Sequence, residues 1–374
     1  TWKAGSDSAH TVLIGDSTAT AAADVDVGIL TVTGNAGALS LTSDQLTGNS
    51  AYQLTANTAT SLSVLSTLGL ELDAGGTGNG VLNATSATSA TFTSGGGAIV
   101  IDGASDLRAA TAITYDAANG SITQTGATTA TAMETLTITA AAGFAATHTG
   151  AMTTDADVSS ISMTATGASA DISFDGLLDA DHVRSVTLTA TGGGNIDLAD
   201  LEMLGIDDDG TTDITTSIVI SANGQDSSDN SSTVTVAAIN VASAATLDSV
   251  TISGDADGVV SFTTGGASLT ITSIDASAML GTLTLSSAAI SGALAATLGA
   301  GTNGVTTEAD LADVITLASA AGTDTFNIAA VSGTSEDQIT NFEAGNNGDI
   351  VSLDVSEIEV SGTAGLQNQT GTDL

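Results

Sequence analysis

The chain has 374 residues, and its 42 acidic side chains face only three lysines and arginines, with no cysteine and no proline. The resulting net charge of -39 excludes nucleic acid and anionic membrane as partners, because both require a basic surface. The lack of cysteine excludes disulfides and thiolate chemistry. A compact body with this charge repels itself, so we expect counter-ions, and an oxygen-rich, thiol-free surface suits Ca²⁺ better than zinc or copper.

Hydrophobic residues make up 42% of the chain, aromatic residues only 2%, and the mean hydropathy is +0.32. This hydrophobicity is too high for ordinary disorder, whereas the shortage of large side chains predicts a thin core. No stretch of about 20 apolar residues occurs, so we expect no membrane insertion. The abundance of Ser, Thr, Gly, Ala and Asp favours short strands joined by tight turns.

Strands that alternate apolar residues with Ser or Thr are predicted from the start of the chain, at 30–34, 39–42, 90–93 and 113–116. The clearest copies begin at Met133, Val158 and Val183, each 25 residues after the one before. Later copies lie at 218–221, 250–253 and 283–286.

The spacing lengthens to 32 residues from Val186 to Ile218 and again from Ile218 to Val250. The extra length coincides with polar inserts at 207–213 and 223–230. Insertions at one corner are how solenoids vary.

These repeats predict an all-β fold, a parallel β-solenoid (β-helix) of roughly 20–33-residue coils. A leucine-rich repeat and a β-sandwich array are the competing folds. The first lacks Leu and Asn at recurring positions, and the second would not repeat its strands in register. We divide the chain into an irregular N-terminal β region (1–105) that starts or caps the solenoid, a regular β-solenoid (106–300) and a distinct C-terminal segment (301–374).

The C-terminal segment contains Gly322-Thr323-Asp324-Thr325-Phe326, then Asp337-Gln338-Ile339-Thr340-Asn341-Phe342, then Gly348-Asp349-Ile350-Val351-Ser352-Leu353. Over about 320–355 this resembles the closing module of repeats-in-toxin (RTX) proteins. The run at 274–285 is similar to RTX-type bacterial surface-layer proteins. The resemblance implies type I secretion without an N-terminal signal peptide, an extracellular cell-surface location, calcium binding and assembly into a coat.

This chain departs from the calcium-binding nonapeptide of that family. Its nearest match, 75–83, has Gly80 where the family has a ligating Asp. Scattered loop sites are therefore expected instead of a regular ladder of calcium sites.

The candidate Ca²⁺ ligands lie in acidic clusters that also contain turn glycines. They are Asp207, Asp209, Asp213, Asp255, Asp257, Asp324, Asp337 and Asp349. A second candidate is a metal-binding column of Asp157, His182 and Asp207, which share one register position. For the acidic clusters the alternative is a solvated insert that binds nothing. For the column the alternative is structural, with acids in turns capping the backbone.

No catalytic constellation is evident, and we expect no enzyme. Lys3, Arg108 and Arg184 are isolated in sequence, no G-x-S-x-G motif accompanies a histidine, and few aromatics are available to line a sugar cleft.

The sequence thus predicts a structural extracellular protein that self-assembles with Ca²⁺ into a surface layer or filament, with cell-surface polysaccharide as a further partner. One alternative is a secreted adhesin that binds glycans or surfaces through solenoid loops. Another is an ice-binding solenoid, which requires flat, regular Thr-x-Thr ladders, and we expect pairs such as Thr31/Thr33 and Thr187/Thr189 not to stack evenly along the chain.

Overall fold

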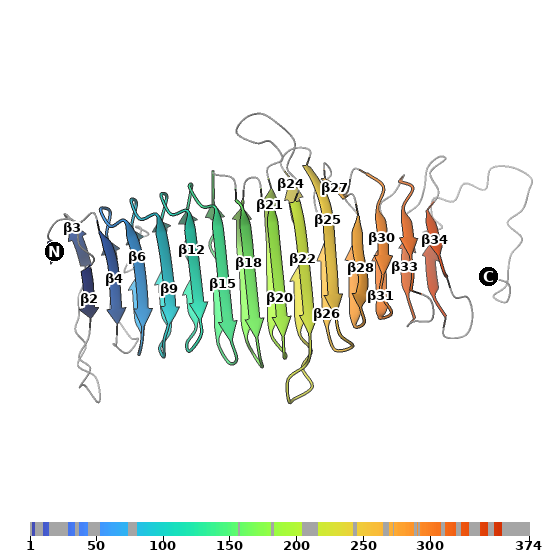
Figure 1. The fold of residues 1–374 in the computed structure, drawn as a ribbon, viewed down its shortest axis with the longest axis horizontal. Helices are drawn as coiled ribbons and strands as arrows, with labels where there is room; N and C mark the ends of the chain where they lie inside the picture. The colour runs from blue at the N-terminus through green and yellow to red at the C-terminus, as the bar shows by residue number, and fades with distance from the viewer. Residues whose placement is uncertain are drawn as a thin grey trace, which may run out of the picture.

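A computed structural model of the chain shows an elongated stack of parallel strands (Figure 1). It describes residues 2–3, 10–14, 29–33, 37–43, 53–73, 81–155, 158–180, 183–203, 216–241, 245–264, 269–271, 273–287, 290, 292–307, 311–318, 323–328, 337–342 and 348–353. These residues form two sheets, of 15 and 20 strands, and contain no helix. Accordingly, none of the described segments is a long apolar helix of the kind that crosses a membrane. The predicted all-β parallel solenoid is confirmed.

The 15-stranded sheet takes about one strand from each coil. Its strands are β2 (His10–Ile14), β4 (Ala38–Ser43), β6 (Ser61–Ser66), β9 (Ser89–Ser94), β12 (Ala112–Ala117), β15 (Thr135–Ala141), β18 (Ser160–Thr166), β20 (Ser185–Thr191), β22 (Thr216–Asn223), β25 (Ala245–Gly254), β27 (Leu269–Ile271), β28 (Ile274–Met279), β30 (Ala295–Leu298), β32 (Val314–Thr316) and β34 (Gln338–Thr340).

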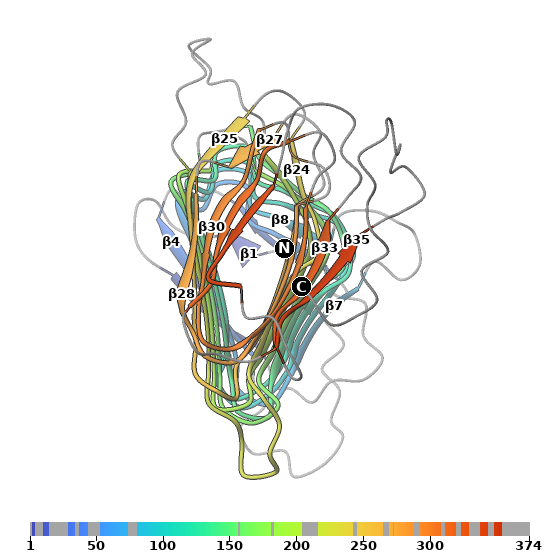
Figure 2. The same ribbon diagram turned by 90° about the vertical axis from the view of Figure 1, so that its right-hand side faces the viewer.

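The 20-stranded sheet consists of two columns that the long strands β19 and β21 join. The first column is β7 (Leu70–Asp73), β10 (Ile99–Asp102), β13 (Ile122–Gln124), β16 (Ala145–His148), β19 (Asp171–Asp179), β21 (Asn195–Met203), β23 (Thr233–Val236), β26 (Val259–Thr263), β29 (Thr282–Ser286), β31 (Thr302–Thr306), β33 (Thr325–Ile328) and β35 (Ile350–Leu353). The second is β1 (Trp2–Lys3), β3 (Ile29–Thr33), β5 (Gln53–Thr55), β8 (Leu82–Asn83), β11 (Ser105–Asp106), β14 (Thr128–Thr129), β17 (Met152–Thr153) and β24 (Ile239–Val241). Seen end-on, the sheets enclose a narrow interior (Figure 2).

The register confirms the predicted repeat. Leu136 pairs with Ile161 and Ile161 with Val186, at the 25-residue spacing. Val186 pairs with Ile218 and Ile218 with Val250, at the 32-residue spacing. The second insert forms a loop between β22 and β23, where Gln225 bridges Ser231, so the added residues leave the strand register unchanged.

Two of the predicted repeat copies were placed wrongly. The copies at 30–34 and 283–286 fall on β3 and β29, in the 20-stranded sheet and not beside β15. Every face of a solenoid buries alternate residues, so the alternating pattern identifies a strand without identifying its face.

The expected unevenness of the Thr-x-Thr pairs is also wrong for the central coils. Thr137, Ser162 and Thr187 are register neighbours on successive coils, and so are Thr139, Thr164 and Thr189. Spacing along the chain is the wrong measure, because loops absorb the insertions while the strands stay in register.

Both sheets continue across residues 105 and 300. β9 pairs with β12 and β10 with β13, and β29 pairs with β31 and β30 with β32. Among the described residues the three-part division thus corresponds to no break in strand pairing, and it stays a prediction.

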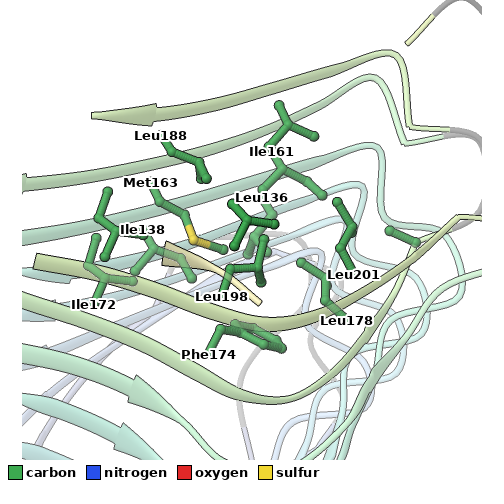
Figure 3. Packing of buried hydrophobic residues seen from close by; sticks show 14 of the residues in the cluster. Leu136, Ile138, Ile161, Met163, Ile172, Phe174, Leu178, Leu188, Leu198 and Leu201 are labelled. Atoms are coloured by element: carbon green, nitrogen blue, oxygen red, sulfur yellow. The ribbon is translucent and has the colours of Figure 1, made fainter. Parts of the chain in front are cut away.

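The interior is lined by matched apolar columns, of which Figure 3 shows the central part. In β15 the burial alternates along the whole strand, with Leu136, Ile138 and Ala140 inside. Their register partners are equally buried, so each side chain packs on a similar one in the next coil. Burying a Leu or Ile side chain contributes about 1.5–3 kcal/mol, and this gain recurs at every coil.

Stacked glycines form one corner of the central coils. A Cβ on Gly126 would lie 2.1 Å from the carbonyl carbon of Gly103, and Cβ atoms on Gly150 and Gly176 would lie 2.2 and 2.0 Å from the carbonyl oxygen of the glycine one coil earlier. Backbone approaches backbone here, so no side chain fits.

We therefore expect Gly126→Ala to lower the free energy of unfolding by about 1–3 kcal/mol, the usual cost of overpacking. Thermal melts followed by circular dichroism would measure it. Gly304→Ala is the matched control, since its Cβ would meet nothing closer than the Leu283 carbonyl oxygen at 3.9 Å. Equal melting temperatures for the two variants would contradict this account of the corner.

Candidate functional site

The predicted calcium ligands of the first acidic insert, Asp207, Asp209 and Asp213, lie outside the described residues. The same is true of Asp157 and His182 in the predicted metal-binding column. The assignment of these residues as ligands stays a prediction.

Asp255 and Asp257 lie in the turn between β25 and β26. The Asp255 carboxylate accepts hydrogen bonds from the backbone N–H groups of Gly224, at 2.7 Å, and of Asp257, at 3.2 Å. It therefore closes its own turn and ties it to the preceding coil. Asp257 is exposed on the same turn.

Asp337 precedes β34, and its carboxylate accepts hydrogen bonds from the preceding coil. One carboxylate oxygen accepts from the backbone N–H of Asp313 at 3.0 Å, and the other from the Thr307 hydroxyl at 3.2 Å. Asp313 in turn accepts from the backbone N–H of Leu294 at 2.7 Å. Each carboxylate thus binds an N–H group of the coil before it.

Asp324 and Asp349 repeat this arrangement before β33 and β35. Asp349 accepts from the backbone N–H of Asp324 at 3.1 Å, and Asp324 accepts from the backbone N–H of Asn303 at 2.9 Å. The Asn303 side-chain amide also donates to Asp324, at 2.9 Å, and to the carbonyl oxygens of Gly299 and Gly301. Burial raises the pKa of Asp324, which is 2% exposed.

The structure does not gather the described candidates around one point. Asp324 and Asp349 are joined through the N–H of Asp324, whereas Asp255 and Asp257 lie several coils away. Among the described residues, no group of three or more His, Cys, Asp or Glu side chains is arranged to hold a metal ion. Asp255, Asp324, Asp337 and Asp349 each accept a hydrogen bond from a backbone N–H group, so they have a structural role that the sequence analysis had not assigned to them.

A larger acidic surface was missed by the sequence analysis. This acidic patch comprises Asp155 and the six carboxylates of β19 and β21, which are Asp171, Asp175, Asp179, Asp197, Asp200 and Glu202. Their sequence separation hides the cluster, and only the register, which pairs Asp179 with Glu202, brings them together. The alternation of acids with buried Ile, Phe and Leu in these two strands was the available signal.

Carboxylates in the acidic patch repel one another. Partial burial first, and then the neighbouring Asp155, raise the pKa of Asp179. The pKa of Asp197 is raised in the same way, with Asp175 as the neighbour, and Glu202 is raised with Asp179 and Asp200 nearby. Raised carboxyl pKa values mean that ionisation here opposes folding, and that a bound cation would relieve the repulsion.

His148 lies in the interior and is 4% exposed. Its Nδ1 lies 2.8 Å from the Gly150 carbonyl oxygen, which can only accept, so Nδ1 carries the proton. Its Nε2 then accepts from the Thr128 hydroxyl at 3.1 Å. The ring stacks on Phe174 at 4.5 Å and meets the edge of Tyr115 at 6.3 Å. With both nitrogens engaged, His148 is a structural group in this state.

Burial lowers the pKa of His148 to about 4 from its ordinary 6.5. Around it lie Thr128, Phe174, Tyr115 and Gln124, of which only Tyr115 titrates and none is an acid that could pair with an imidazolium. The folded state therefore favours the neutral imidazole. Its contribution to stability is complete above pH 6.5 and is lost as the pH falls through 4.

We expect His148→Gln to abolish this dependence. Gln124, the register neighbour one coil earlier, already makes equivalent bonds to the Gly126 carbonyl and the Ser105 hydroxyl. Urea unfolding between pH 7 and pH 4 should show the wild type losing about 3 kcal/mol more than the variant. The acidic patch titrates in both proteins and cancels in the difference. Identical pH dependences would show that His148 is not the group responsible.

No known protein family, no curated protein and no solved structure matches this chain.

Proposed function

We propose that this protein is an extracellular structural subunit that self-assembles with Ca²⁺ into a filament or surface layer. The observation that carries the proposal is the open stack. Among the described strands, β34 and β35 each pair with one neighbour only, and so do β1 and β2 at the other end. Unpaired N–H and C=O groups at a sheet edge are a template for another strand.

The last described strand also exposes apolar side chains. Val351, the register partner of buried Phe326, is 37% exposed, although the same position of earlier strands is buried. Ile350 beside it faces outward and is 54% exposed. Because all strands run parallel, the two ends differ, so a contact between them is head-to-tail and generates an open filament.

The role of Ca²⁺ is supported by the charge. At -39, acidic surfaces of two copies that face each other repel one another unless cations neutralise them. The acidic patch supplies carboxylate oxygens, the ligands that Ca²⁺ prefers. We propose that Ca²⁺ lies between copies at such surfaces.

The remaining parts of the proposal rest on the sequence. The resemblance of residues 320–355 to the RTX closing module supports type I secretion and a cell-surface location, with surface polysaccharide as the attachment partner. A non-catalytic role is supported by Arg108, whose side chain pairs with Asp106, and by His148, whose two nitrogens are engaged.

A secreted adhesin is the second candidate, and the loop between β22 and β23 favours it (Figure 1). Residues 227–230 are exposed. Asp226 holds the loop in shape by accepting from the N–H groups of Ser228 and Asn230. An ordered, exposed loop is suited to binding a glycan or surface, and an adhesin of this kind would stay discrete in Ca²⁺.

The first test is a calcium titration followed by size-exclusion chromatography and negative-stain microscopy. We expect polymers with millimolar Ca²⁺, dispersal by excess chelator and recovery when Ca²⁺ is restored. Magnesium at equal ionic strength is the control for simple screening. Particles of one size at every calcium concentration would sink the assembly proposal and leave the adhesin.

The second test changes the open end. Ile350→Asp places a charge on the apolar edge and should shorten or abolish filaments in Ca²⁺. Thr284→Asp adds the same charge to an exposed position within the 20-stranded sheet and should leave filaments intact. Filaments of unchanged length from Ile350→Asp would show that this edge is not the contact.

A further inference from the structure

The outward side of the central 15-stranded sheet carries an ordered array of hydroxyl groups. We define the hydroxyl face as the outward residues of β6, β9, β12, β15, β18, β20, β22 and β25, which lie side by side in Figure 1. One column of register neighbours runs Ser63, Thr91, Thr114, Thr137, Ser162 and Thr187, and then continues through Val219 to Thr251. Similar columns flank it, so the face is a grid of mostly hydroxyl side chains.

This face is nearly free of charge. Among its eight strands, Asp116 and Asp248 are the only charged residues, and Asp116 accepts a hydrogen bond from the Thr139 hydroxyl at 2.7 Å. The strands β19 and β21, which belong to the other sheet of the same coils, carry six acidic residues. In a chain of net charge -39, the 15-stranded side of the central coils is therefore nearly neutral, whereas the other sheet carries six carboxylates on these two strands alone.

We propose that the hydroxyl face is the surface at which two copies of this protein pack against each other. The inference rests on the proposed function, since it names a second contact in the same assembly. Two copies can approach through neutral surfaces without the cations that an acidic contact requires. In the 20-stranded sheet, β19 and β21 carry the acidic patch, and the uncharged strands β23, β26, β29 and β31 are only four or five residues long, so they offer a smaller neutral surface.

The dimensions fit a stable interface. The eight strands are six to ten residues long, and at about 4.8 Å between strands and about 3.3 Å per residue they cover about 900 Å². Two copies would bury about 1,800 Å², within the usual range of about 1,200–2,000 Å² for specific complexes.

The side chains also suit close packing. Parallel, in-register strands with small uncharged side chains form dry, interdigitated contacts between paired sheets. Hydroxyls of the two copies can exchange hydrogen bonds, and threonine methyl groups fill the spaces between them. The hydroxyl face contains no aromatic residue on which a sugar ring could stack, which argues against a glycan as its occupant.

The two contacts differ in symmetry and in their need for calcium. A head-to-tail contact between solenoid ends continues indefinitely. A contact between identical faces has two-fold symmetry and closes after two copies. The assembly would therefore be a pair of filaments joined along their neutral sides, and the pair contact would survive chelation.

The test is sedimentation of the full chain in excess chelator, where calcium-dependent polymers are absent. We expect a wild-type dimer. Thr137→Glu with Thr187→Glu should raise its dissociation constant by about 100-fold or more, because like charges would face each other across a dry interface. Thr123→Glu with Thr235→Glu adds the same charge to outward positions of β13 and β23 and should leave the dimer intact. Unchanged circular dichroism melts verify the fold of both variants.

Crosslinking is the second measurement. The chain has no cysteine, so single variants Thr137→Cys, Ser162→Cys and Thr187→Cys report contacts without background. At least one, the one nearest the two-fold axis, should form a disulfide-linked dimer on mild oxidation, and Thr147→Cys on β16 should not.

A wild-type monomer in chelator at high concentration would overturn the proposal, and so would a dimer that the Glu pair leaves intact. Thermal hysteresis from a monomer would likewise overturn it and assign the hydroxyl face to ice. These experiments can refute the face contact and the proposed filament independently of each other. A dimer in chelator without polymers in Ca²⁺ refutes only the filament, and calcium-dependent polymers from a protein that is monomeric in chelator refute only the face contact.

Discussion

Parallel hydrogen bonding between successive coils is the constraint on which this structure depends. Each strand pairs in register with the equivalent strand of the next coil, from β2 to β34 along one sheet and from β7 to β35 along the other. A residue therefore sits above and below a residue of the same role. The corner glycines, the apolar columns, the hydroxyl columns and the aspartates before β32 to β35 all follow from that repetition.

Repetition also constrains which side chains fit in the interior, because each coil offers nearly the same environment. A buried polar side chain can therefore lie next to another at the same position of the next coil. The interior polar residues show how this is solved. Gln124 and His148 are register neighbours, and each donates to the carbonyl of the residue two positions on and pairs with a hydroxyl from the neighbouring column. Burial of these two side chains then costs little, because each of their nitrogen and oxygen atoms has a hydrogen-bond partner.

Function in such a molecule resides in surfaces more than in a cleft. The ends present unpaired strand edges, one broad face is acidic, and the opposite face is neutral. Each surface favours a different contact: edges favour strand pairing, carboxylates favour cations and hydroxyls favour close packing. A chain with one repeated coil can thus encode several contacts, since the outward residues of each face vary independently of the buried ones.

The sequence alone determined the fold class and the coil length at the centre, because the spacings from Leu136 to Val250 are local arithmetic that the register reproduces. It also identified Asp324, Asp337 and Asp349 as special positions, though not the backbone N–H groups that they accept. Only the tertiary structure decided which strands share a face, as β3 and β29 show, and which residues meet across coils. The acidic patch and the hydroxyl face bring together register neighbours that are 23 to 32 positions apart in sequence. Loops of variable length hide that proximity, and only the hydrogen-bonded register reveals it.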